Sequence, residues 1–136
     1  MANGLYDKGR EAFLLADIDW AADTIQAILV DTALYTVNLA AHDFLDDIPG
    51  GARVGSAVTL GTKTATNGVA DAADISFTSL SSAPTIEALV IYKSTGTEST
   101  SALIAYIDTA TGLPVSAGAT QVDVTWDNGS NRIFKL

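Results

Sequence analysis

The single histidine, His42, limits the acid–base chemistry open to this chain of 136 residues. A Ser/His/Asp catalytic triad would have to use it, and Asp43 and Asp46 stand close to it in the sequence. Many hydrolases carry the nucleophilic serine in a tight G-x-S-x-G turn, and no serine of this chain has that surrounding. We therefore interpret His42 as a polar residue on a short helix, and we predict that the protein is not an enzyme.

Pairs of nearby aspartates raise the question of a calcium site; they are Asp46 with Asp47, Asp71 with Asp74, and Asp123 with Asp127. Calcium loops of the EF-hand type place carboxylates at alternate positions before a glycine, and the sequence lacks this spacing. Two carboxylates can also hydrolyse a glycosidic bond when they share a cleft, but nothing in the sequence brings these together. A glycine-rich phosphate loop is missing as well. We therefore predict solvated loop carboxylates, no bound metal and no cofactor.

The chain is strongly acidic, with 16 Asp and Glu against 7 Lys and Arg, a formal net charge of −9 and a pI of about 4.1. Nucleic-acid binding needs clustered basic side chains that neutralise phosphates, and an anionic membrane surface repels an acidic chain. We therefore predict no nucleic-acid partner and no membrane partner. The absence of cysteine excludes disulfides and is typical of a protein made in a reducing cytoplasm. We also expect no signal peptide and no membrane span, because no apolar run approaches about 20 residues.

Two apolar runs, residues 86–92 and 102–107, form the centre of the expected fold. Both are rich in β-branched and aromatic residues, and both have the length of a strand buried on its two faces. The polar segment between them predicts a hairpin. We expect its core side chains to be buried together with one residue of a later strand; these are Leu89, Ile91, Leu103, Tyr106 and Trp126.

The remaining pattern predicts short elements around this hairpin. Apolar spacing favours a helix over residues 5–16, and a second short helix over 40–48 would begin near Asn38 and end at 49–51. The Asn67-Gly68 and 127–129 segments are typical of hairpin turns. Alternating or apolar runs predict the other strands, at residues 24–30, 52–60, 62–66, 74–78, 121–126 and 132–136.

These elements indicate a mainly β fold in a single domain, residues 1–136. Seven to nine short strands with regular turns predict an antiparallel β-sandwich or jelly roll with a short N-terminal α-helix. A smaller antiparallel sheet packed on the helices is the alternative.

Several stretches together resemble a family of small structural proteins of tailed bacteriophages. They are GLYDKGREAFL (residues 4–14), IDWAADTIQAILVDT (18–32), HDFLDDI (42–48), ALVIY (88–92), LIAYID (103–108) and VTWD (124–127). Within this family, the chain is most similar to the capsid decoration, or cement, proteins. It departs from the pattern at Leu15-Ala16 and at Ala21-Ala22, where similar sequences carry glycines or acids, and this predicts extra apolar surface for a neighbour.

The resemblance implies a virion protein, made in the host cytoplasm, that binds the outer surface of the capsid. Its partners would be the major capsid protein and further copies of itself, most simply in a homotrimer. The resemblance transfers no catalytic residue. The alternative is a module of the tail or fibre that binds a host glycan or another tail component.

The least structured segments, residues 1–7 and 31–39, are expected to reach neighbouring subunits. The 31–39 loop carries more apolar side chains than a free loop usually exposes, and only 17% of the chain is charged. The predicted interface residues are Leu5, Tyr6, Leu34, Tyr35, Val37 and Leu39.

Overall fold

A computed structural model describes residues 3–110 and 112–136, and it confirms a mainly β fold with antiparallel strands and one α-helix. The helix is α1 (Asp7–Leu14), and the three short 3-10 helices are η1 (Leu45–Asp47), η2 (Gly50–Ala52) and η3 (Glu98–Thr100). The strands are β1 (Gly4–Leu5), β2 (Ile25–Val30), β3 (Arg53–Thr59), β4 (Thr64–Thr66), β5 (Val69–Asp71), β6 (Ile75–Phe77), β7 (Ala88–Lys93), β8 (Leu103–Ile107), β9 (Val122–Val124) and β10 (Phe134–Lys135).

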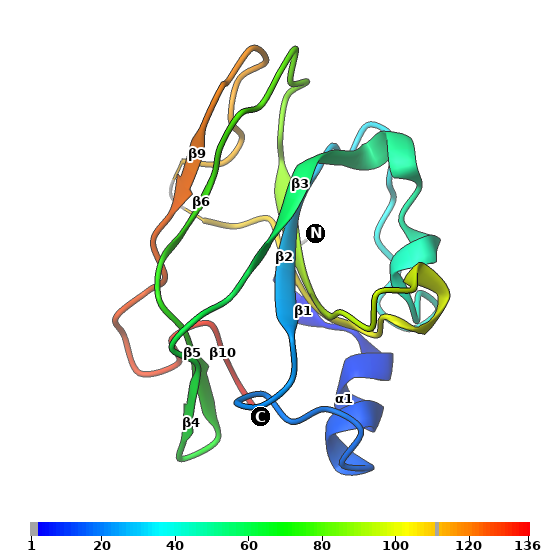
Figure 1. Ribbon diagram of the computed structural model, residues 1–136, viewed down its shortest axis with the longest axis vertical. Helices are drawn as coiled ribbons and strands as arrows, with labels where there is room; N and C mark the ends of the chain where they lie inside the picture. The colour runs from blue at the N-terminus through cyan, green and yellow to red at the C-terminus, as the bar shows by residue number, and fades with distance from the viewer. Residues whose placement is uncertain (1–2, 111) are drawn as a thin grey trace.

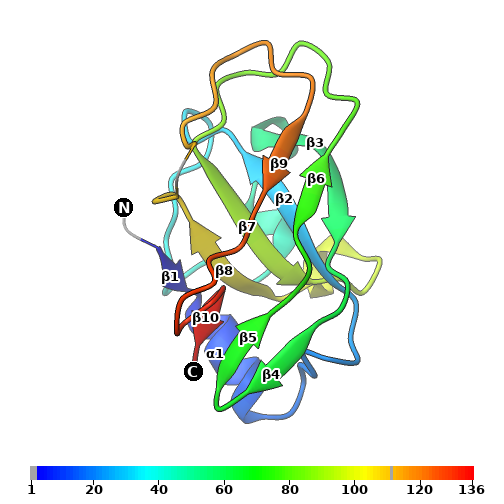
Figure 2. The same cartoon turned by 90° about the vertical axis from the view of Figure 1, so that its left-hand side faces the viewer.

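The central sheet has five strands in the order β1-β8-β7-β2-β3 (Figures 1 and 2). The predicted hairpin is confirmed, since β7 and β8 pair antiparallel with Ile91 opposite Ala105. On its other side β7 pairs with β2, where Leu89 lies opposite Leu29. The five predicted core side chains are all buried.

Both faces of the central sheet are buried, which explains why its strands read as continuous apolar runs rather than as alternating ones. Along β7, Leu89 and Ile91 point into one core, while Val90 and Tyr92 point into a second core on the opposite face. The first core also contains Trp126, and the second contains the buried 31–52 side chains described below. One layer of covering structure is therefore needed on each face.

Two small sheets cover the first face. One is β6 paired with β9, and the other is β10-β5-β4 (Figure 2). The predicted Asn67-Gly68 turn joins β4 to β5, and both residues have positive φ, 56° and 77°, as a two-residue hairpin turn requires. Phe77 of β6 is almost completely buried between the layers.

The 31–52 connection covers the second face, and here the predicted helix over residues 40–48 is wrong. The chain forms only η1 and η2, so the 49–51 segment begins a 3-10 helix and does not end an α-helix. Asn38 does cap a turn, because its Oδ1 accepts hydrogen bonds from the Ala40 and Ala41 amides. Phe44 forms a β-bridge with Ala102, and the Leu45 amide donates to the Ser101 carbonyl, so the backbone of residues 43–45 bonds to the start of β8 and not within an α-helix.

Two further sequence predictions need correction. The helix begins at Asp7 and not at residue 5, because Leu5 lies in β1 opposite Ala105. The 127–129 turn does not form a hairpin, since β9 pairs with β6 while β10 pairs with β5. The reason is that the Trp126 amide and indole donate to Asp74 Oδ1 and the Ala73 carbonyl, which fixes the end of β9 beside β6.

Helix α1 lies directly against β8, and Gly9 makes this close approach possible. A Cβ atom at Gly9 would lie 2.7 Å from the Leu103 carbonyl oxygen and 2.9 Å from the Ile104 Cα. Gly9 and Ala12 form the buried face of this helix. Trp20 is also buried.

Candidate functional site

Exposed apolar side chains gather at one end of the molecule. The exposed fractions are 87% for Leu14, 62% for Leu15, 57% for Leu136 and 57% for Leu34. The first three lie where α1 and the C-terminal strand β10 meet the β4-β5 hairpin, at the bottom of Figures 1 and 2. We name this part of the chain the groove end; it comprises residues 7–24, 61–71 and 126–136 with Lys93.

A groove of about 420 Å³ opens at the groove end. Its aromatic lining is held by ring contacts: Phe134 packs edge-to-face on Trp20 with centroids 5.2 Å apart, and Phe13 lies 6.0 Å from Phe134. The Trp20 indole nitrogen donates to the Asp71 carbonyl, which fixes the ring against β5. Ala65 lines the opposite side, where its small side chain leaves space. Aromatic walls and a small residue make this groove suited to an apolar side chain.

Charge is distributed unevenly between the groove end and the rest of the chain. The groove end holds six of the seven basic residues and seven of the sixteen acidic ones, so its side chains carry −1 and the remainder carries −8. Many of these charges are paired locally, as in Lys8–Glu11 and Arg10–Asp7, both at 2.9 Å. Elsewhere the one basic residue is Arg53, which pairs with Glu98 at 2.8 Å. The groove end is thus nearly neutral in an otherwise acidic protein.

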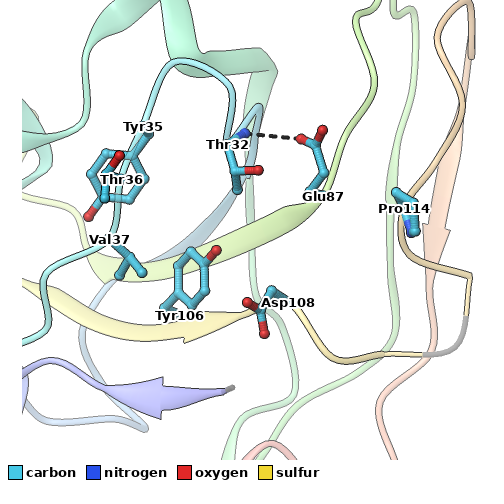
Figure 3. A pocket seen from close by; sticks show the side chains of 8 residues that line it. All are labelled: Thr32, Tyr35, Thr36, Val37, Glu87, Tyr106, Asp108 and Pro114. Carbon is cyan, nitrogen blue, oxygen red and sulfur yellow. Dashed lines mark hydrogen bonds between the residues drawn. The ribbon is translucent and has the colours of Figure 1, made fainter. Parts of the chain in front are cut away.

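A second hollow, of about 360 Å³, lies between the 31–39 loop and the central sheet (Figure 3). Tyr35 and Val37 of the loop and Tyr106 of β8 line it together with two carboxylates, Glu87 and Asp108. The Thr32 amide donates to Glu87 Oε2 at 3.0 Å, which fixes the start of the loop (Figure 3). Burial, and next the negative charge of Asp108, raise the pKa of Tyr106 to about 12. Among the described residues that line this hollow there is no lysine or arginine.

A chain of hydrogen bonds holds the 31–42 segment to the sheet. The Tyr6 and Tyr35 hydroxyls lie 3.0 Å apart, and the Tyr35 hydroxyl lies 2.8 Å from His42 Nδ1. The Asn38 amide donates to the same nitrogen at 3.2 Å, so Nδ1 acts as an acceptor. His42 thus anchors a loop, and it does not lie on the short helix that the sequence predicted. Burial raises the pKa of both Tyr6 and Tyr35.

The structure separates the predicted interface residues into three groups. Leu34 is exposed, as an interface residue should be; Leu5, Val37 and Leu39 are half-buried. The expectation is wrong for the Tyr6 and Tyr35 side chains, which are inside the protein and bonded to each other. Residues 1 and 2 of the predicted 1–7 contact segment lie outside the described residues.

The groove end was only partly visible in the sequence, through the apolar Leu15-Ala16 pair. A stronger signal was available: Leu14 follows Asp7, Arg10 and Glu11 at helical spacing, so it is a leucine on the polar face of α1. The groove itself had no local signal, because its walls come from three segments far apart in the chain.

The aspartate pairs act within the structure. Asp74 accepts the Trp126 amide, Asp123 accepts from Ser76 and Gln121, and Asp47 accepts the amides of residues 43 and 44. Among the described residues, no group of three or more His, Cys, Asp or Glu side chains is arranged to hold a metal ion. Asp47, Asp74 and Asp123 thus hold loops and strand ends in place.

Comparison of the chain with known protein families and with curated protein sequences gives no match. Within residues 3–110 and 112–136, no helix has the length and apolar character needed to cross a membrane.

Proposed function

We propose that the protein is a virion structural protein of a tailed bacteriophage that binds the outer surface of the capsid and stabilises it as a decoration protein. It would act as a homotrimer with the major capsid protein as its partner. The sequence resemblance supports this function, and one structural observation carries it further. Exposed leucines lie on two separate parts of the molecule: Leu34 is on the 31–39 loop, on the right-hand side of Figure 1, and Leu14 and Leu15 are at the groove end, at the bottom.

Two separate apolar surfaces suit a protein that has to join other subunits. A decoration protein needs one contact with the shell and another with its own neighbours, since bridging requires at least two. Such binding stabilises the assembled shell because the protein binds the assembled form better than free subunits. Apolar contacts repeated by symmetry add interface area at every copy.

We assign the shell contact to the 31–39 loop. Leu34 is its most exposed large side chain, and it lies beside Gly51 of η2, whose Cβ position is 4.0 Å from Leu34 Cδ1. The loop is anchored at Thr32 and at Tyr35, so Leu34 projects from a fixed base and loses little conformational freedom on binding. The acidic hollow next to it suits a basic side chain of the shell.

The test uses phage particles that lack this protein, mixed with the purified protein. We expect particles to assemble without the protein and to release their DNA at a lower temperature than complete particles. When the purified protein is added, each particle should bind hundreds of copies of it. Leu34→Ser should reduce the number of bound copies, whereas Ala33→Ser, one residue away on the same exposed loop, should not. Particles that keep full stability without the protein but fail to adsorb to cells would overturn the proposal in favour of a tail or fibre component.

A further inference from the structure

We propose that the groove end binds a second copy of this chain, with the Leu14 and Leu15 side chains of one copy inserted into the Trp20–Phe134 groove of the next. We name these two leucines the leucine ridge. The inference deepens the proposed function, on which it rests for the expectation that copies meet in a symmetric assembly, and it assigns the surface through which they meet.

The leucine ridge is largely exposed in the single subunit. Leu14 is 87% exposed, and it is an apolar side chain on a helix face that otherwise carries the charged residues Asp7, Arg10 and Glu11. The last turn of α1 therefore presents two adjacent large apolar side chains to solvent, and an exposed patch of this kind next to a groove is typical of an interaction site.

The groove is an apolar hollow that can receive the leucine ridge, and both lie at the groove end of the same chain. Phe13 and Ala16, which flank the ridge in sequence, form one wall of the groove, and Phe134 and Trp20 form its aromatic part. A surface with a projecting part and a matching hollow can bind another copy of itself head to tail. Such contacts close into a ring when the rotation between copies is a fraction of a full turn, as in a trimer.

The distribution of charge favours a second copy of the chain as the occupant of the groove. Two chains of net charge −9 repel each other, and the repulsion is strongest where the acidic part of one faces the acidic part of the other. The groove end carries a side-chain charge of only −1, with both signs interspersed along α1. It is therefore the surface on which two copies approach with the least electrostatic cost, and on which they also bury apolar area.

The experiment measures the self-association of the free protein, without phage particles, by sedimentation velocity over a wide range of concentration. We expect the wild type to associate, and we expect Leu14→Ser with Leu15→Ser to raise the dissociation constant at least about tenfold, because central apolar contacts dominate such interfaces. Leu34→Ser, which changes an equally large exposed leucine outside the groove end, should leave self-association unchanged. Circular dichroism of each variant checks that the fold is retained.

A second pair of variants tests the head-to-tail arrangement. Ala65→Trp fills the groove from its exposed side, and this variant alone should show a similar rise in the dissociation constant. Mixing it with the double leucine variant should restore a one-to-one dimer, since one partner keeps its ridge and the other keeps its groove. A mixture that stays monomeric, while the wild type associates, would overturn the insertion.

Failure of this inference and failure of the proposed function give different results. A wild type that is monomeric at every concentration, or a double leucine variant that associates like the wild type, overturns the inference even if the protein binds phage particles. A protein that associates through the ridge but does not bind particles overturns the function and leaves the inference intact.

Discussion

The Tyr35 hydroxyl lies between the Tyr6 hydroxyl, at 3.0 Å, and His42 Nδ1, at 2.8 Å. The Tyr35 oxygen thus connects Tyr6, which follows β1, to His42 at the end of the 31–42 segment. Tyr6 is fully buried, so its hydroxyl has no access to water in the described structure. The Tyr35 hydroxyl is therefore one anchor of the 31–39 loop, in addition to the Thr32 amide that donates to Glu87.

Tyr35→Phe removes that group and leaves the Tyr6 hydroxyl buried without its partner. We expect the free energy of unfolding to fall by about 1–3 kcal/mol, the usual penalty for an unsatisfied buried polar group. Chemical denaturation measures this change. Tyr92→Phe is the matched control, since the half-buried Gln26 that accepts from Tyr92 keeps access to water, and the loss should be about 0.5–1.5 kcal/mol. A smaller loss for Tyr35→Phe than for Tyr92→Phe would contradict the anchoring role.

Alkaline pH should unfold the protein through its tyrosines. Burial raises the pKa of all four, and that of Tyr106 rises to about 12. The unfolded chain then releases protons at a lower pH than the folded one, so stability is complete below about pH 10 and falls as the pH rises from there. Ultraviolet absorbance of tyrosinate and circular dichroism should change together above pH 10. Tyrosines that titrate near pH 10 while the circular dichroism remains native would refute this expectation.

Leu89→Ala tests the core of the central sheet. Leu89 is 4% exposed and lies between Leu29 and Ile107 on neighbouring strands. The cavity left by the change should lower the free energy of unfolding by about 2–5 kcal/mol. Leu14→Ala makes the same chemical change on the surface and should alter it by less than about 0.5 kcal/mol when measured on the monomer at low concentration. Equal effects of the two substitutions would rule out this placement of the core.

Gly9→Ala should destabilise the protein although alanine favours helix formation by about 1 kcal/mol over glycine. The new methyl group would press on the Leu103 carbonyl and the Ile104 Cα, which are backbone atoms and cannot move aside as a side chain can. The thermal midpoint of unfolding should therefore fall. Gly61→Ala, where no atom lies within 4 Å of the Cβ position, is the control and should leave the midpoint nearly unchanged. A rise at Gly9→Ala would show that α1 stands further from β8.

The elements that the sequence predicted well are those with a strong local pattern. The two apolar runs of β7 and β8 are joined by one turn-forming segment, and Asn67-Gly68 requires a backbone that few other pairs adopt. The 127–129 segment has an equally good turn pattern, yet β10 pairs with β5 and not with β9. A turn pattern shows that the chain reverses direction, but it does not show with which strand the following segment pairs.

The predicted interface failed at Tyr6 and Tyr35 for a related reason. A tyrosine near the end of a helix or in a loop looks exposed when it is read alone, and the burial of these two depends on a partner 29 residues away. The groove has the same character, since Phe13, Ala65 and Phe134 meet only in the folded chain. Sequence patterns describe the periodicity of one segment and do not show which distant segments come into contact.

The walls of the groove are synthesised at different times, because they lie far apart in the sequence. A ribosome makes α1 first, the β4-β5 hairpin halfway and Phe134 last, so a nascent chain displays the leucine ridge long before any groove exists to receive it. Pairing between copies then waits until β10 has docked on β5. On the proposed pairing, a subunit whose β10 has not yet docked lacks one wall of the groove and cannot act as an acceptor.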